Sequence, residues 1–199
     1  MYHKLLNLAT DAEFYFLLRL IDDDLARMAR AEGCTCGGKV HTADYPRKPR
    51  GGPKGVRDRI VMRASFCCAE EGCRRRKTPP SVRFLGRKVY FAVVVLLLPI
   101  LQEGATPLRV RRLRALFRVS QRTLQRWRRW WLEVVPQTQW WQAERAHRAA
   151  GVEAERGLPA SLLHGLFEQD GSAIDGARAV LVVLMRLPCY TSRPVEHAR

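Results

Sequence analysis

The segments CTCGG, residues 34–38, and CCAEEGC, residues 67–73, decide the fold of this chain. Each brings cysteines together in a short glycine-containing turn, and about thirty residues separate the two. Zinc prefers four thiolate or imidazole ligands in a tetrahedron, and two such turns at the end of an antiparallel hairpin supply that geometry. Gly37 and Gly38 allow the tight backbone turn after the first pair. We therefore predict a structural zinc site with these ligands: Cys34, Cys36, Cys68 and Cys73.

One ligand position has two candidates. Cys67 and Cys68 are adjacent, and Cys68 is preferred because it gives the shorter return to Cys73. His41 is a weaker fifth candidate, and Cys189 stands alone as an ordinary thiol. The alternative interpretation is a group of free, buried cysteines that cluster without a metal.

The charge balance is strongly basic. The chain of 199 residues has 35 Lys or Arg against 19 Asp or Glu, a formal net charge of +16. Such an excess costs stability through self-repulsion and is usually offset by a polyanion, either nucleic acid or an anionic membrane surface. Most of the basic residues are Arg, whose guanidinium forms bidentate pairs with phosphate and guanine, so the composition favours nucleic acid.

No segment predicts a membrane span or a secretory leader. Residues 1–8 lack the charged, apolar and small-residue zones of a signal peptide. The longest apolar run, Val89–Leu101, contains Pro99 and falls short of the roughly 18 residues that a span needs. We expect a cytoplasmic, nucleoid-associated protein without a membrane partner, whose reduced cysteines are available to a metal.

Residues 110–131 predict a helix-turn-helix. Apolar residues recur at helical spacing on both sides of a turn at Val119 and Ser120, so one face of each helix should point inward. Two positions depart from the usual pattern, because Arg114 stands where the first helix has a small residue and Arg118 stands where the turn often has glycine. The expected inward set is Leu113, Leu116, Phe117, Val119, Leu124 and Trp127.

The remaining side chains of this segment are those that contact DNA. Gln and Arg read adenine and guanine edges in the major groove, and further Arg residues bind phosphates. The outer face should comprise Gln121, Arg122, Gln125, Arg126 and Arg129, with Ser120 as the cap before them. Nearer the phosphates we expect Arg109, Arg111, Arg112, Arg118 and Arg128, together with Arg74, Arg75, Arg76 and Lys77 and the basic stretch 47–59. A solvated or partner-binding helix is the alternative, but residues 109–129 hold nine Arg and no acid, which solvation alone does not explain.

The predicted fold class is mostly α, with a small β zinc ribbon and a helix-turn-helix bundle. Helical periodicity runs through residues 11–31, and a strand is expected over residues 60–68. The apolar helix should end at Leu98 before Pro99, and Thr106 with Pro107 should open the next. The Trp residues at 130, 131, 140 and 141 are expected in the core. Four regions follow: an N-terminal helix at 1–33, the ribbon at 34–85, the helix-turn-helix at 86–136 and C-terminal helices at 137–199.

The order of these parts resembles the N-terminal half of insertion-sequence transposases that carry a zinc ribbon before their catalytic domain. In that family, the second cysteine turn is followed by a short Ser/Thr-containing segment, an apolar helix and a helix-turn-helix. The matching positions here are Thr78–Phe84, Val89–Leu98 and Val119–Arg129. The likeness covers about residues 30–135, and it implies zinc at the four cysteines and DNA at the helix-turn-helix.

The chain departs from that family after position 137. Such transposases continue into an RNase H-like domain with three carboxylates that hold two metal ions, whereas about 60 residues follow here and they predict helices. We therefore expect a DNA-binding accessory protein or regulator of a mobile element, without strand-transfer chemistry. Its expected partners are duplex DNA and either a transposase or a second copy as a homodimer.

Two other functions compete with this one. An RNA-binding or ribosome-associated zinc-ribbon protein fits the charge equally well. An enzyme would use Asp22, Asp23 and Asp24 as a metal site, but successive helical residues point about 100° apart, so at most two could share an ion. A solvated helical face is the simpler interpretation of these acids, and we expect no catalytic activity.

Overall fold

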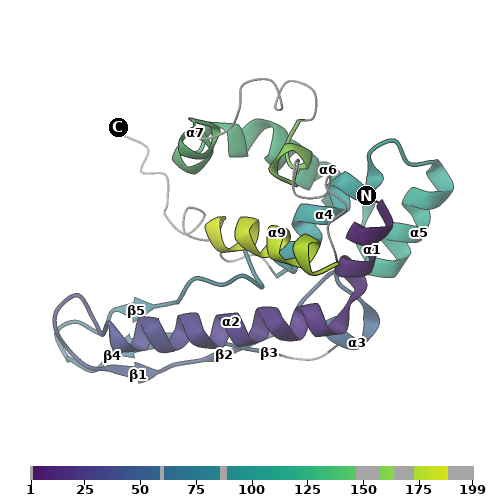
Figure 1. Cartoon of the computed structure of the whole chain (residues 1–199). Helices are drawn as coiled ribbons and strands as arrows, with labels where there is room; N and C mark the ends of the chain where they lie inside the picture. The colour runs from purple at the N-terminus through teal and green to yellow at the C-terminus, as the bar shows by residue number, and fades with distance from the viewer. Residues whose placement is uncertain (1, 59–60, 86–88, 147–156, 164–172, 188–199) are drawn as a thin grey trace.

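The computed structural model in Figure 1 describes residues 2–58, 61–85, 89–146, 157–163 and 173–187. Helices dominate it, and a small antiparallel sheet accompanies them, as the composition and periodicity predict. The helices are α1 (Tyr2–Thr10), α2 (Ala12–Ala31), α3 (Lys54–Arg57), α4 (Ala92–Gln102), α5 (Pro107–Phe117), α6 (Gln121–Arg129), α7 (Gln139–Ala146) and α9 (Ala173–Arg186). The strands are β1 (Val40–Thr42), β2 (Tyr45–Arg47), β3 (Val61–Arg63), β4 (Phe66–Cys68) and β5 (Arg76–Lys77).

Helix α4 is the centre of the core. All of its residues except Pro99 and Gln102 are buried, and it packs against α1, α5, α6 and α9. The prediction that Pro99 ends this helix is wrong, because α4 continues to Gln102 with the proline inside it. Proline has no N–H, so the Val95 carbonyl four residues earlier lacks its helical partner. The Trp131 indole Nε1 donates to that carbonyl at 3.0 Å instead, which satisfies the buried group and lets the helix continue.

The predicted strand at residues 60–68 is two strands, β3 and β4, in separate sheets. Strand β2 pairs with β3 and β1 pairs with β4, both antiparallel, and β5 pairs with β4. The two sheets keep one register, from Val40 opposite Cys68 to Arg47 opposite Val61. Residues 40–47 and 61–68 therefore form a single antiparallel ribbon, interrupted where the Ser65 N–H donates to the Asp44 carboxylate at 2.9 Å.

Helix α2 runs along this ribbon (Figure 1) and begins and ends close to prediction, with Asp11 as its N-cap. The buried Asp22 carboxylate accepts hydrogen bonds from Ser81 Oγ at 2.6 Å, Val82 N at 2.7 Å and Arg83 Nε at 2.7 Å. Near the C-terminal end of α2, Lys77 Nζ donates to the Ala29 carbonyl at 3.2 Å. These contacts fix α2 against residues 77–83, which follow the second cysteine turn.

Helices α5 and α6 are joined by the three residues 118–120. Arg118 adopts the left-handed conformation at φ 49°, and Ser120 Oγ accepts from Thr123 N at 3.2 Å as the N-cap of α6. Thr106 and Pro107 open α5 as predicted. The expected inward residues are buried, with one exception: Leu116 is 41% exposed, because it lies on the outer side of α5.

The C-terminal part of the described chain covers the core. A π-helical turn at Trp130–Val134 and a 3-10 turn at Val135–Gln137 extend α6. Trp131, Trp140 and Trp141 are buried, and Trp130 is half-buried, which confirms their assignment to the core. A 3-10 turn at Ala160–Leu163 and helix α9 follow. The C-terminal helices predicted over 137–199 lie partly outside the described residues, and α1 was not predicted.

Candidate metal centre

Four cysteines gather where α2 and the ribbon meet. Their sulfur atoms all lie within 4.8 Å of one another, with Cys34 Sγ 3.7 Å from Cys73 Sγ and Cys36 Sγ 3.5 Å from Cys68 Sγ. Cys68 is buried, Cys34 and Cys73 are half-buried and Cys36 is exposed. The cluster could hold a metal ion, and it consists of the four residues that the sequence predicts.

The first cysteine turn follows directly from the end of α2. The Cys34 N–H donates to the Gly38 carbonyl at 3.2 Å, and the Gly37 N–H donates to the Cys34 carbonyl at 2.9 Å. Gly37 has φ 84°, a conformation that favours glycine. A Cβ added at Gly38 would lie 3.0 Å from Cys68 Sγ and 3.3 Å from Cys36 Sγ. Both glycines are therefore needed for the two halves of the cluster to approach.

The second turn leaves the end of β4. The N–H groups of Cys73 and Arg74 both donate to the Glu70 carbonyl at 3.0 Å. Arg74 takes φ 44°, and the Cys68 N–H then donates to the Arg75 carbonyl at 3.0 Å as the chain returns. This closed loop brings Cys73 back to Cys68.

The choice between Cys67 and Cys68 is resolved by the pleat of β4. Adjacent strand residues point to opposite faces, so only one of them can face the other sulfurs. Cys68 does so, whereas Cys67 Sγ contacts the Arg74 carbonyl at 3.5 Å. His41 lies opposite Cys67 in the register and is outside the cluster, as far as the described residues show. Cys189 lies outside the described residues.

The sulfur spacing fits a tetrahedral metal better than disulfides. Metal–thiolate bonds of about 2.3 Å in a tetrahedron place the sulfurs about 3.8 Å apart. The two sulfur pairs at 3.7 and 3.5 Å are close to that value, and both are far beyond a disulfide bond of about 2.05 Å. The residues present therefore suit a thiophilic divalent ion.

The thiols of the cluster have unequal proton affinities. The backbone N–H of Cys36 lowers the pKa of the Cys34 thiol to about 6, with further help from the neighbouring sulfurs. Burial raises the pKa of the Cys68 thiol to about 12. A bound cation stabilises thiolate at every ligand, so it would oppose the effect of burial at Cys68.

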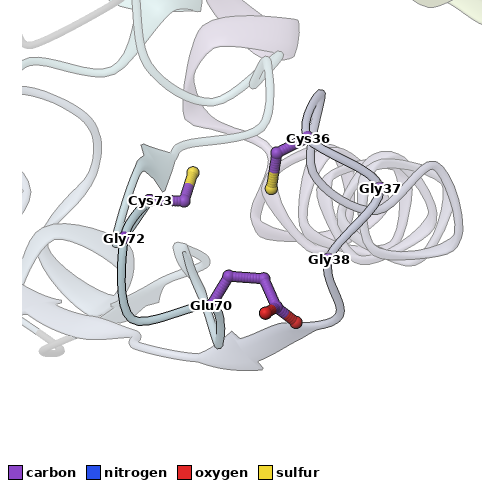
Figure 2. A pocket seen from close by; sticks show the side chains of 6 residues that line it. All are labelled: Cys36, Gly37, Gly38, Glu70, Gly72 and Cys73. Carbon is purple, nitrogen blue, oxygen red and sulfur yellow. The ribbon is translucent and has the colours of Figure 1, made fainter.

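An open hollow adjoins the cluster (Figure 2). It is lined by Cys36, Gly37, Gly38, Glu70, Gly72 and Cys73. The side chains of Cys36 and Cys73 point into the same space, and the Glu70 carboxylate lies at its edge. Four sulfurs are enough to complete a tetrahedral coordination shell around one ion.

Most residues predicted to contact DNA lie around α5 and α6, whereas the predicted contacts at residues 74–77 belong to the second cysteine turn. Their exposure follows the prediction, because the buried side of α6 is formed by Thr123, Leu124 and Trp127. Arg129 Nε lies 3.8 Å from a Glu133 oxygen, and Arg109 is half-buried. The exposed residues around α6 are Ser120, Gln121, Arg122, Gln125, Arg126, Arg128 and Arg129, and those around α5 are Arg111, Arg112 and Arg118.

The basic residues after Cys73 make contacts within the chain that the sequence did not predict. Arg75 donates to the Thr35 hydroxyl at 2.7 Å, and Arg76 donates to the Ala43 carbonyl at 3.2 Å. Lys77 Nζ is 2.6 Å from a Glu32 oxygen, in addition to its contact with the end of α2. These side chains hold the second cysteine turn in place. Arg74 is the exposed member whose side chain makes no hydrogen bond or ion pair in the described structure.

Three contacts between distant segments were not predicted. They involve Asp22 with Arg83, Trp131 with Val95, and Arg57, whose Nη1 donates to the Gly52 and Leu116 carbonyls, both at 2.8 Å. A polar side chain in an apolar neighbourhood is the only sequence signal for such contacts. The pairings themselves depend on which segments become neighbours in space.

The acids at 22–24 do not converge on a common point. Asp22 faces residues 81–83, Asp23 lies 3.8 Å from Arg19, and Asp24 pairs with Arg27. Within the described chain, the four cysteines are the group of ligand-type residues close enough to share an ion.

Comparison of the chain with protein-family models, curated proteins and solved structures finds no match. None of the described helices combines the length and apolar composition that crossing a membrane requires. The function therefore has to be inferred from the chemistry of the residues themselves.

Proposed function

We propose that this chain is a zinc-containing protein that binds duplex DNA through α5 and α6, as an accessory or regulatory protein of a mobile element. The observation that carries the proposal is the outer face of α6. Gln121, Arg122, Gln125 and Arg126 are exposed there, and none of their side chains makes a hydrogen bond or ion pair within the described part of the chain. They are free to bind an external ligand.

Zinc is the ion that suits the cluster best. Four thiolates in a tetrahedral arrangement select zinc over the harder magnesium and calcium ions, which prefer oxygen. Cys34, Cys36, Cys68 and Cys73 would hold the ion, and its role would be to lock the ribbon against α2. The ribbon region is short of apolar residues, so metal binding supplies folding free energy that packing does not.

The identity of the free side chains favours nucleic acid. Arg forms bidentate hydrogen bonds with guanine, and Gln does so with adenine, in a major groove wide enough for a helix. Burial of Leu124 and Trp127 fixes the rotation of α6, so the Gln and Arg side chains stay together on its outer face. A helix held in this way can present a fixed pattern of donors and acceptors to base edges.

The arginines around the turn between α5 and α6 would bind the phosphates. Arg111, Arg112 and Arg118 are exposed, and their side chains make no hydrogen bond or ion pair within the described structure. They lie on α5 and on the connection that precedes α6, where they can flank a groove entered by α6. No acidic residue lies between positions 109 and 129, so the approach of a polyanion is not opposed locally.

The assignment to a mobile element rests on the order of parts along the chain. A cysteine ribbon, an apolar helix and a DNA-binding helix pair follow one another as in the N-terminal half of insertion-sequence transposases. We infer that the chain recognises element ends or regulates their use.

Retardation of duplex DNA by the zinc-loaded protein over a salt series tests this proposal. We expect tight binding that weakens steeply with salt, since each neutralised phosphate adds about 0.9 to the slope of log affinity against log salt. Arg111→Ala should lower that slope by about 1, and Arg30→Ala, an exposed arginine on α2, should leave it unchanged. Salt-insensitive or absent binding would contradict the proposal, and a preference for structured RNA over duplex DNA would replace it with RNA binding.

A further inference from the structure

Helix α2 carries an exposed apolar face that the rest of the described chain does not cover. Its inner side buries Phe14, Tyr15 and Leu18. On the opposite side, Phe16 is 49% exposed and Leu20 is 43% exposed, with Leu17 beside them at 39%. We call these three residues the α2 face. Large apolar side chains grouped on one surface of a helix mark a site of protein association.

The charge of α2 sets it apart from the rest of this basic chain. The helix carries Glu13, Asp22, Asp23 and Asp24 against Arg19, Arg27 and Arg30, so the excess of 16 positive charges lies outside it. The Arg-rich surfaces around α5 and α6 would bring like charges of two copies into contact, which costs several kcal/mol. The α2 face lets two copies meet without that repulsion.

The charges around the α2 face are also arranged to suit a two-fold axis. Glu13 lies seven residues before Leu20 and Arg27 lies seven residues after it. Seven residues are about two helical turns, or about 10.5 Å, so all three share one side of the helix. When two α2 helices cross antiparallel at Leu20, Glu13 of each copy lies next to Arg27 of the other. A two-fold interface needs this self-complementarity.

We propose that a second copy of this chain docks on the α2 face, with the two α2 helices antiparallel, Leu20 at the axis and Phe16 on either side of it. Glu13 is exposed, and no ion pair within the described structure occupies its carboxylate. Arg27 is exposed and pairs locally with Asp24, and its guanidinium has five N–H donors, so it can also donate to a second carboxylate. This homodimer does not depend on DNA binding, but it would present two α6 helices to a two-fold DNA site.

Sedimentation velocity of the full, zinc-loaded chain over a concentration series tests the proposal. We expect a reversible monomer–dimer equilibrium. Leu20→Glu should weaken it on the order of 100-fold, because a charge is then buried at the axis. Met28→Glu is the matched control, since Met28 is 62% exposed on the same helix but lies two turns away from the axis. It should leave the dimer intact.

Charge reversal tests the antiparallel register independently. Glu13→Arg alone should weaken the dimer about tenfold by placing two arginines together. The double variant Glu13→Arg/Arg27→Glu should restore it, because the pair is re-formed with exchanged signs. All these positions are exposed, and circular dichroism with thermal melting verifies that each variant folds. A protein that stays monomeric, a dimer that survives Leu20→Glu, or a double variant no better than Glu13→Arg would each overturn the proposal.

Discussion

The indole Nε1 of Trp131 donates a hydrogen bond to the carbonyl oxygen of Val95, at a distance of 3.0 Å. That carbonyl is the one that Pro99 leaves without a partner inside α4. The contact therefore joins the helical extension of α6 to the buried centre of the core. Since α4 packs against both α5 and α6, this hydrogen bond helps set the position of the helix pair that we assign to DNA.

Trp131→Phe should lower the free energy of unfolding by about 2 kcal/mol, because it leaves the Val95 carbonyl buried and unsatisfied. The matched control is Trp140→Phe. Trp140 is also buried, but its Nε1 has no hydrogen-bond partner, so removal of that N–H should cost little. Urea denaturation of the two variants compares them directly, and equal losses would show that ring volume matters rather than the hydrogen bond.

Pro99→Ala provides a second test of the same contact. Alanine restores a backbone N–H at position 99, which can donate to the Val95 carbonyl within α4. The cost of Trp131→Phe should then shrink by about 1 kcal/mol when it is measured in the Pro99→Ala background. Additive effects of the two substitutions would mean that Pro99 and Trp131 do not share this carbonyl.

The elements that the sequence predicts well are those with local signals. Ser120 and Thr106 are caps recognisable from their immediate neighbours, and the cysteine spacing identifies the cluster. The continuation of α4 past Pro99 could not be predicted, because it depends on a hydrogen bond from Trp131 to Val95, 36 positions apart. Leu116 fits the apolar periodicity of α5 but is exposed, because periodicity does not say how far the neighbouring elements cover α5. The break at Ser65 likewise depends on Asp44 across the ribbon.

Asp22→Asn should be strongly destabilising, by about 3–5 kcal/mol, because it leaves the buried Arg83 without its carboxylate. Burial already lowers the pKa of the neighbouring Arg63, for which the Asp22 charge is a compensating influence. Asp23→Asn, at the adjacent exposed position, should change stability by no more than about 0.5 kcal/mol. Thermal melting of the pair measures the difference, and similar values would refute the role assigned to Asp22.

Cys68→Ser should abolish stoichiometric zinc, since one of four thiolates is lost from the buried side of the cluster. Cys67→Ser should retain one zinc per chain, because the Cys67 sulfur points to the other face of β4. Metal content by atomic emission after dialysis gives the answer. Loss of zinc in Cys67→Ser with retention in Cys68→Ser would reverse the ligand assignment.

Arg57→Met should loosen the connection between α5 and α6. The Arg57 guanidinium holds the Leu116 carbonyl at the end of α5, two residues before Arg118. Without it, amide hydrogen exchange at residues 118–120 should be faster, and stability should fall by about 2 kcal/mol. Lys54→Met, at an exposed position of the same short helix, is the control. If amide hydrogen exchange at residues 118–120 is unchanged in Arg57→Met, Arg57 does not hold the connection between α5 and α6.

Sequencing of duplexes that the zinc-loaded protein selects from a random library tests the central claim most directly, namely that the outer face of α6 reads DNA. We predict a defined motif for the wild-type protein. Arg126→Ala should lose the preference at one position, typically a guanine, at a cost of about 1–3 kcal/mol for that base, while Arg111→Ala should weaken binding to all sequences alike. A motif that is unchanged by Gln125→Ala and Arg126→Ala, or the absence of any motif, would contradict the account.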